Sequence, residues 1–213
     1  MISIIIPACN EEKYLKETIN SVKNQGYKHE IIVVCDGCTD KTAETAKSLA
    51  DKFVILKERH GPAFAKNEGE KMAAYNKLVF LDADTKLTKN VLKEISEVLD
   101  RGYVGTCRIK PSDPKFKHKT MMFLKNLYPF PYTNGILFCT REAFRKVKGF
   151  PEVKKGEERN ILKQLAEDFE FKVIKNPVIS STRRFDKKGY FNVMFYWIKE
   201  YFKPSDEDYE VIR

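Results

Sequence analysis

The sequence predicts an α/β protein built on a mainly parallel β-sheet with helices on both faces. Through the first hundred residues, short runs of branched aliphatic residues alternate with segments of helical periodicity, which is the pattern of repeated βαβ units. The expected strands cover residues 2–7, 30–35, 53–57 and 77–82. At 213 residues, of which 42% are hydrophobic, the chain is long enough to bury the core of one domain.

The second half of the chain is less regular. Between residues 110 and 135, prolines, lysines and aromatic residues are mixed, and we expect one short helix there, near 116–127. The predicted parts are a domain over residues 1–186, with a regular half (1–100) and a looser half (101–186), and a short C-terminal appendage over 187–213, an aromatic and basic helix with a tail.

Positive charge is concentrated in this second half. The whole chain has a net charge of +9, whereas its first hundred residues, with 15 basic and 16 acidic side chains, are nearly neutral. Such a surface favours a polyanionic partner, whether nucleic acid, anionic lipid headgroups or a phosphorylated substrate. No apolar run is long enough to span a bilayer, and the opening MISIIIPACNEEK lacks the basic start of a secretory signal. The expected location is therefore cytoplasmic.

Five cysteines are scattered along the chain, an odd number without an export signal, which favours free thiols. Cys35 and Cys38 form a C-x-x-C spacing that also occurs in redox pairs and as half of a zinc site. The sequence has no second pair at metal spacing. Free thiols are therefore the expected state.

Polar residues follow three of the expected strands, at the positions where open parallel sheets bind ligands. They are the segment from Pro7 to Glu11, Asp36 with Gly37, and Asp82 with Asp84. Two carboxylates this close at a strand end can face one small volume, where Mg²⁺ or Mn²⁺ would relieve their repulsion. Taken by itself, the D-x-D pattern leaves a second interpretation open, in which one aspartate caps the next turn and the other is solvated.

Five segments in order resemble the family 2 glycosyltransferases of the GT-A fold, which transfer a sugar from a nucleotide donor. They are SIIIPACNE, VVCDGCTDKT, GPAFAKNEG, FLDAD, and the pair NGILFCTREAFRKVKGFPE and GEERNIL, which together span about residues 1–165. The resemblance implies a Rossmann-like GT-A domain. Its nucleotide-binding half would be residues 1–100 and its acceptor-binding half residues 101–186.

For the donor, the resemblance implies that Pro7, Glu11 and Asp36 hold the base and ribose of a UDP- or GDP-sugar. A carboxylate can accept from a ring N–H, and Gly37 lets the backbone pass close to a flat base. Lys66 stands where the family more often has arginine. It can balance a carboxylate or a phosphate, but it lacks the bidentate fork.

For the metal, the resemblance implies that Asp84 binds Mn²⁺ or Mg²⁺ directly, while Asp82 reaches the ribose or a metal-bound water. The cation would bridge the two phosphates and stabilise the nucleoside diphosphate as it leaves. The implied activity is that of a metal-dependent, inverting glycosyltransferase of the hexosyltransferase type.

For the acceptor, the family places an acidic pair, usually Glu-Asp, at the start of a late helix, and its second member deprotonates the acceptor. Glu157 and Glu158 stand at this position, so Glu158 is the expected catalytic base, with one methylene more than aspartate. A purely structural role near a helix N-terminus stays open for both acids. The segment Arg183-Arg184-Phe185 resembles the family's later arginine-aromatic motif near the diphosphate, although the usual preceding glutamine is absent.

The lysines of the second half alternate with apolar side chains. The apolar side chains are Phe116, Met121, Met122, Phe123 and Leu124, and the lysines among them are Lys110, Lys115, Lys117, Lys119 and Lys125. A second apolar segment, from Tyr190 to Phe202, is also flanked by lysines. We hypothesise that both elements rest on the anionic inner face of a membrane and present the site to a lipid-linked or lipid-phosphate acceptor. Packing of both helices on the sheet, or a dimer contact, explains the pattern equally well.

Two other functions fit part of the sequence. A sugar nucleotidyltransferase also uses such a sheet and a divalent cation, but it usually has a glycine-rich loop after the first strand, where this chain has PACNEE. A nucleic-acid-binding module fits the isoelectric point near 9.2, yet acids at three strand ends would repel phosphate without a metal, so no nucleic-acid partner is expected. A family member that binds without catalysis is disfavoured because positions 84 and 158 are both acidic.

Overall fold

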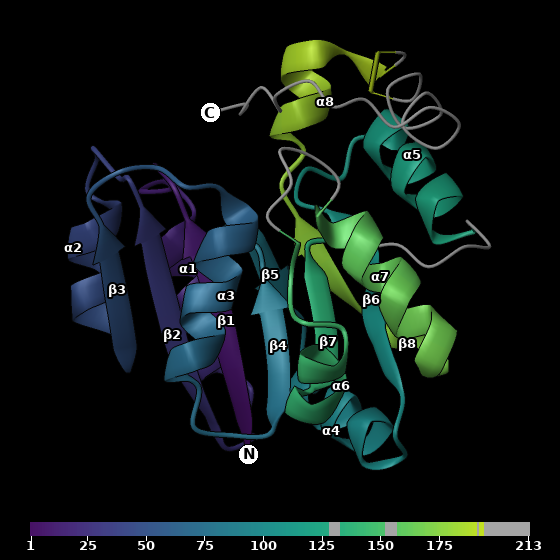
Figure 1. The fold of residues 1–213 in the computed structure, drawn as a ribbon. Coiled ribbons are helices and arrows are strands. Elements are labelled where there is room, and N and C mark those ends of the chain that lie inside the picture. Colours follow the sequence, from purple (N-terminus) through teal and green to yellow (C-terminus); the bar gives the residue numbers. More distant parts are fainter. Residues whose placement is uncertain (128–132, 152–156, 191, 194–213) are drawn as a thin grey trace.

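The computed structural model describes residues 1–127, 133–151, 157–190 and 192–193 of the chain. Its centre is an eight-stranded sheet in the order β3-β2-β1-β4-β7-β6-β8-β5. The strands are β1 (Ile2–Ala8), β2 (His29–Asp36), β3 (Lys52–Leu56), β4 (Lys77–Leu81), β5 (Thr85–Leu87), β6 (Val104–Pro111), β7 (Ile136–Thr140) and β8 (Phe171–Ser180). The helices, which cover both faces of the sheet (Figure 1), are α1 (Leu15–Lys23), α2 (Thr42–Leu49), α3 (Pro62–Met72), α4 (Val91–Asp100), α5 (Phe116–Asn126), α6 (Arg141–Lys146), α7 (Glu157–Asp168) and α8 (Arg183–Lys188).

The first four strands form the parallel half of the sheet. β1 lies between β2 and β4 and is parallel to both, and β3 extends the sheet beyond β2. Each of the four predicted strands is confirmed to within one residue at either end. Their nearly continuous apolar runs agree with burial on both faces. The predicted α/β architecture is therefore confirmed.

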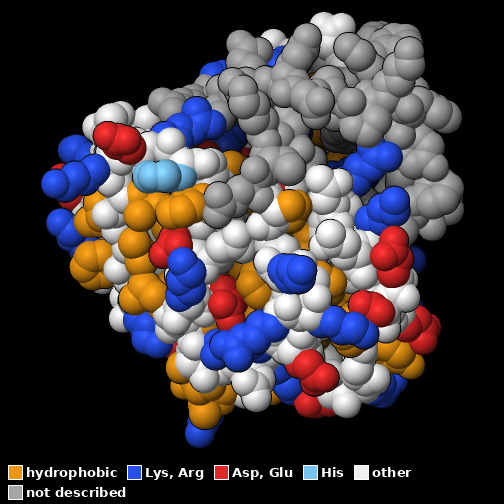
Figure 2. Space-filling model, in the orientation of Figure 1, with side chains coloured by type: hydrophobic (Ala, Val, Ile, Leu, Met, Phe, Trp, Pro, Cys, Tyr) orange, Lys and Arg blue, Asp and Glu red, His pale blue; other side chains and the backbone are white. Residues whose placement is uncertain are grey.

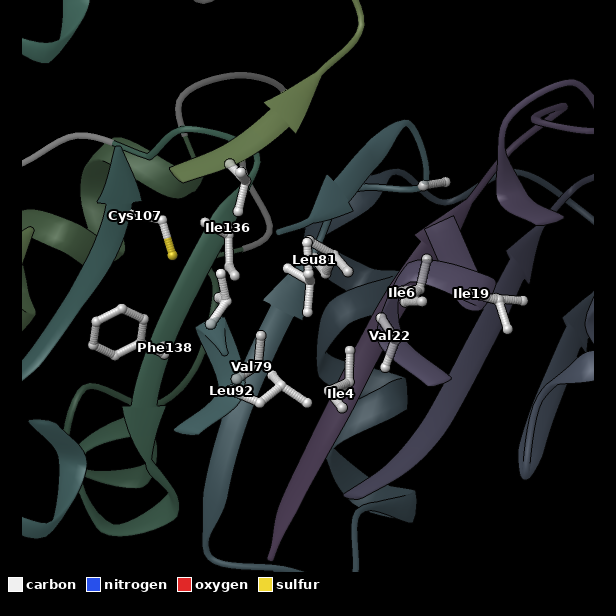
Figure 3. Close-up of a cluster of buried hydrophobic side chains, with 14 of the residues drawn as sticks. Ile4, Ile6, Ile19, Val22, Val79, Leu81, Leu92, Cys107, Ile136 and Phe138 are labelled. Atoms are coloured by element: carbon white, nitrogen blue, oxygen red, sulfur yellow. The ribbon is translucent and has the colours of Figure 1, made fainter. Parts of the chain in front are cut away.

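Hydrophobic cores on the two faces hold this half rigid. Side chains of β1 alternate between the faces, so Ile4 and Ile6 pack with Ile19 and Val22 of α1 (Figure 3), whereas Ile5 belongs to the core beneath α3 and α6. Each of these side chains is fully buried, and such burial stabilises the fold by roughly 1.5–3 kcal/mol per residue. The carboxyl ends of the strands therefore have fixed positions.

The second half of the sheet is mixed. β7 is antiparallel to both β4 and β6, β8 is parallel to β6, and β5 is antiparallel to β8. The segment from Asp82 to Asp84 lies between β4 and β5. It therefore joins the centre of the sheet to the last strand in the order.

The predicted helix near 116–127 is confirmed as α5. The predicted boundary after residue 186 falls inside α8, and the ring of Tyr190 stacks on that of Phe185 at 5.7 Å, so the division of the chain there stays a prediction. Beyond residue 193, the predicted aromatic helix lies outside the described residues. Within the described ranges, the structure has no helix that combines the length and the hydropathy needed to cross a membrane.

Candidate active site

The predicted site residues gather at the carboxyl ends of the parallel strands. Asp36 is the last residue of β2, Asp82 directly follows β4, and Glu11 comes shortly after β1. The start of α7 brings Glu158 to the same edge of the sheet, and the start of α8 brings Arg183. Hydrogen bonds divide these residues into two groups, one around a lysine of α3 and the other around an arginine of α8.

The first group is centred on Lys66, whose side chain is almost fully buried. Its Nζ donates to Glu158 Oε1 at 2.6 Å, lies 3.9 Å from Glu157 Oε1, and stands 4.8 Å from the ring centroid of Phe150. Burial alone would lower the pKa of Lys66, but the carboxylates of Glu158, Asp82 and Glu157 raise it above its ordinary value. Lys66 is therefore a permanent ammonium that joins α3 to the start of α7.

Asp82 belongs to the same group through its charge, which acts on Lys66. Burial and the nearby Glu158 carboxylate raise the pKa of Asp82 to about 7, although Lys66 acts in the opposite direction. Gly135 lies against it: a Cβ there would stand 3.3 Å from Asp82 Oδ2 and 2.5 Å from Thr85 Oγ1, and its φ is +75°. Asp82 thus occupies a tight enclosure that holds more acid than Lys66 neutralises.

The pKa values of the two glutamates at the start of α7 are shifted in opposite directions. Burial works to raise the pKa of Glu158, but Lys66 and the Thr133 hydroxyl, which donates to Oε2, hold it below its ordinary value. For Glu157, burial raises the pKa. Glu158, the predicted base, is therefore the more readily ionised of the pair.

The second group is centred on Arg183. Its Nη1 and Nη2 donate to Glu11 Oε2 and Oε1 at 2.8 and 2.6 Å, and Nη2 lies 3.3 Å from Asp84 Oδ2. The guanidinium also lies 4.9 Å from the ring centroid of Tyr14. Burial raises the pKa of both Glu11 and Asp84, and Arg183 opposes this. One arginine is thus the shared counter-ion of two predicted site carboxylates.

Asp36 is held by the protein itself. Its Oδ1 accepts from the backbone N–H of His60 at 2.8 Å, and its Oδ2 accepts from that of Gly61 at 2.7 Å, which fixes the loop before α3. A Cβ on Gly37 would stand 2.8 Å from the backbone nitrogen of Arg59, at a φ of +64°. Close packing of this loop is therefore enough to require the glycine. The contact of Asp36 with a nucleotide stays a prediction.

Pro7, the last residue of the expected strand and the first of the expected site loop, lies inside β1. The strand continues to Ala8 because the pairing with β2 extends that far. The pairing with β4 ends at Ile5, so Pro7 is paired on one side only, where a residue without an N–H is tolerated.

Lys125 was assigned to the basic surface, but it belongs to the site. It lies on the inner face of α5, where burial and the charge of Arg184 lower the pKa of Lys125 to about 8, while Glu158 and Asp82 act in the opposite direction. The spacing could have revealed this, because the two buried residues of α5, His118 and Met122, precede Lys125 at helical intervals. Lys125 therefore adds positive charge beside the acidic group.

The donor atoms near Asp82 and Asp84 suit a hard divalent cation. Among the described residues, no three His, Cys, Asp or Glu side chains are grouped so that they could hold a metal by themselves. Mg²⁺ and Mn²⁺ are commonly bound through one or two carboxylates, with phosphate and water oxygens filling the shell. Burial, and then the Glu158 carboxylate, raise the pKa of Asp82, so a bound cation would favour its ionised form. The carboxylate donors of Asp82 and Asp84 therefore fit a divalent cation bound with a diphosphate.

The C-x-x-C cysteines are free thiols, as predicted, and so are the other three. The Cys38 thiol donates to the carbonyl of Ala8 at 3.3 Å. Its contact with Cys35 lowers the pKa of Cys38 to about 7 and raises that of Cys35.

Comparison with known proteins tests the predicted family independently. Residues 3–151 match the model of the family described as glycosyl transferase family 2. An uncharacterized glycosyltransferase of Haemophilus influenzae is 31% identical over 169 residues, which are 72% of this chain and 67% of that protein. An undecaprenyl-phosphate 4-deoxy-4-formamido-L-arabinose transferase of Edwardsiella ictaluri is 28% identical over 138 residues, 59% of this chain and 42% of that protein. The match therefore spans about two thirds of the length of the first relative and less than half of the second.

Solved structures share the fold. The mannosyltransferase PcManGT from Pyrobaculum calidifontis, in complex with GDP-Man and Mn²⁺, has a TM-score of 0.68 at 20% identity, covering 84% of this chain and 56% of that one. Staphylococcus aureus TarS 1–349, in complex with UDP-GlcNAc, has a TM-score of 0.67 at 20% identity, covering 85% and 58%. The predicted GT-A fold is confirmed. Because the family match covers more than half of its residues, the chain belongs to glycosyl transferase family 2.

Proposed function

We propose that this protein transfers a sugar from a nucleotide-diphosphate sugar to an acceptor, with inversion and with the help of Mn²⁺ or Mg²⁺. The observation that carries the proposal is the meeting of Asp82, Asp84 and Glu158 at one edge of the sheet of a family 2 glycosyltransferase. Glu158 comes from a segment far from the two aspartates in the sequence, and all three acids are partly buried.

On the donor side, Asp84 and Asp82 are the proposed metal-binding carboxylates. A bound divalent cation would stabilise the negative charge that develops on the departing diphosphate. Glu11, Asp36 and Pro7 are proposed to line the site of the base and ribose. One structural neighbour was solved in complex with UDP-GlcNAc and another in complex with GDP-Man and Mn²⁺, which supports a UDP- or GDP-sugar as the donor class.

On the acceptor side, Glu158 is the proposed base. The Thr133 hydroxyl already donates to its Oε2, so a hydroxyl can reach this carboxylate oxygen. In the proposed step, an acceptor hydroxyl takes that position and its proton passes to Glu158, while its oxygen bonds to the sugar carbon as the bond to the diphosphate breaks. Lys66 holds the other oxygen of Glu158 throughout and so fixes the direction of the carboxylate.

The proposed acceptor is either a hydroxyl or a lipid phosphate. A relative named as an undecaprenyl-phosphate transferase supports a lipid phosphate beside a hydroxyl as the acceptor. A phosphate oxygen is already ionised near neutral pH, so it would attack without needing Glu158 as a base. The positive charges of Lys125 and Arg184 on this side of the site would suit such an anion.

The test is a thermal-shift titration with UDP and GDP, each with and without Mn²⁺, on the wild type, on Asp84→Asn and on Asp100→Asn. Asp100 is a matched control because it pairs with Lys77, outside both groups of the site. A nucleotide at a hundredfold excess over its Kd should stabilise the wild type and the control by about 2.7 kcal/mol. The stabilisation should need Mn²⁺ and disappear in Asp84→Asn. Absence of any shift with both nucleotides would overturn the proposed donor class.

A further inference from the structure

Helix α5 presents an apolar stripe to solvent. Phe116, Phe123 and Leu127 are 84%, 61% and 62% exposed and lie on one helical face, and Leu124 beside them is 52% exposed. The described part of the chain has eight exposed large hydrophobic side chains in all. Half of them therefore lie on one short helix and its end, which scattered surface hydrophobics do not explain.

Lysines flank this stripe. Lys117 and Lys119 are exposed, and helical spacing places them on opposite sides of the line from Phe116 to Phe123. Lys115 precedes the helix and is also exposed. The helix itself contains no acidic residue. On the face drawn in Figure 2, by contrast, basic and acidic side chains alternate over the lower part of the molecule.

Helix α8 extends the basic surface. It packs on α5 through Phe185, whose ring centroid lies 5.9 Å from that of His118. The ring centroid of Tyr190, which follows α8, lies 5.4 Å from that of His118. Lys187 and Lys188 are exposed at its end. Among the described residues, two acids lie nearby: Asp113 pairs with Lys115 at 2.7 Å, and Asp186 faces His118 at 3.4 Å. Within the described part of this surface, the exposed Lys115, Lys117, Lys119 and Lys187 therefore outnumber the aspartates.

We propose that the α5 surface, defined as Phe116, Phe123, Leu124 and Leu127 with the flanking lysines, docks onto an anionic lipid bilayer. A helix with an apolar stripe and basic flanks lies in the plane of the interface, with its apolar side chains at the acyl boundary and its ammonium groups among the headgroups. A symmetric contact with a second copy would bring the same lysines together, and their repulsion disfavours it. An anionic bilayer matches both the charge and the apolar stripe.

The opposite face of α5 points toward the reaction centre. Lys125 lies on that face and interacts with the charges of Glu158 and Asp82. The thickness of one helix, about 10 Å, would therefore separate the bilayer from the acceptor side of the site. This consequence rests on the proposed function: the acceptor would be a lipid whose reactive group lies at the level of the headgroups.

The experiment is flotation of the full chain with vesicles of phosphatidylcholine, with and without phosphatidylglycerol. The wild type should float with the anionic vesicles at low salt and be released at high salt. The triple variant Phe116→Ser/Phe123→Ser/Leu127→Ser should bind at least about tenfold more weakly, because it removes the apolar stripe. Lys117→Gln/Lys119→Gln should bind about 30-fold more weakly, because each lysine near an anionic surface contributes about 1 kcal/mol and about 1.4 kcal/mol corresponds to a factor of ten.

A matched control lies at the other end of the sheet. Phe53 and Ile55 of β3 are 41% and 42% exposed, so Phe53→Ser/Ile55→Ser removes exposed apolar side chains away from α5 and should float like the wild type. Every variant should keep the nucleotide-dependent thermal shift, which separates loss of docking from loss of the donor site. The proposal is overturned if the wild type ignores anionic vesicles or if the triple variant floats equally well. It is also overturned if light scattering shows that the stripe instead holds a dimer that does not bind vesicles.

Discussion

Asp82 and Asp84 are separated by one residue, yet they belong to different charge groups. Asp82 lies with Glu157 and Glu158 beside Lys66, an ammonium in the middle of a core helix. Asp84 lies with Glu11 beside Arg183, a guanidinium at the first residue of α8. In both groups the carboxylates outnumber the central cation.

The two groups differ in whether a bound ligand could take the place of the central cation: Lys66 is fixed, and Arg183 is replaceable. The Lys66 side chain is 3% exposed and joins two helices, so no ligand can take its place without disrupting α3 and α7. The Arg183 side chain is 20% exposed and comes from the last described helix, at the edge of the site. We therefore expect changes in the Lys66 group to affect stability and chemistry, and changes at Arg183 to affect mainly metal binding.

The largest effect is expected for Glu158→Gln. Loss of the proposed base should lower kcat by about 10²- to 10⁴-fold for a hydroxyl acceptor, whereas the nucleotide-dependent thermal shift should persist. Glu157→Gln is the matched control and should keep most of the activity. If Glu157→Gln loses activity and Glu158→Gln retains it, the base is Glu157. If neither matters, the acceptor needs no base, as expected of a phosphate.

Lys66→Met should be the most destabilising change. It leaves three partly buried acids without their buried ammonium, and removing one partner of a buried ion pair costs about 3–5 kcal/mol. Urea denaturation measures the difference in the free energy of unfolding. Lys71→Met, on the same helix but with a 66% exposed side chain, should stay within about 0.5 kcal/mol of the wild type. An equal loss in both variants would show that Lys66 has no special role.

Asp82→Asn should change the pH dependence of stability in metal-free protein. The folded-state pKa of Asp82 is about 7, well above the unfolded value of about 3.9. Between these values the folded state holds more protons, so the wild type should lose stability as pH rises from about 4 to 7.

The asparagine variant lacks this titration. It should be more stable than the wild type by roughly 1–3 kcal/mol at pH 8 in EDTA, with most of the gap gone at pH 4. Chemical denaturation at the two pH values measures it, and a gap that does not depend on pH would contradict the assignment.

Arg183→Gln should have the smallest effect on the fold and a specific effect on the metal. Removing the guanidinium from Asp84 should strengthen nucleotide-free Mn²⁺ binding by about tenfold, because a partly buried ion pair contributes about 1 kcal/mol or slightly more. Mn²⁺ electron paramagnetic resonance measures free and bound ion directly. Arg108→Gln, an exposed arginine of β6, is the control. Unchanged Mn²⁺ affinity in Arg183→Gln would show that the two cations do not compete.

Much of the site could be predicted because its acids follow local patterns. Asp36 and Asp82 lie at strand ends that the apolar runs mark clearly, and the late acidic pair starts a helix as expected. The hydrogen-bond and ion-pair partners of these side chains were harder to predict. Nothing local indicates that Asp36 accepts from the loop before α3, or that Arg183 pairs with Glu11.

The sequence by itself determined the parallel half of the sheet, the positions of the strand-end acids and the family. These depend on periodicity and on short segments whose chemistry is local. Tertiary structure alone decided which charges meet. The bond between Glu11 and Arg183 joins residues 172 positions apart, and that between Lys66 and Glu158 joins residues 92 apart. The physical reason is that burial makes each charge depend on a partner, and folding brings that partner from a distant part of the chain.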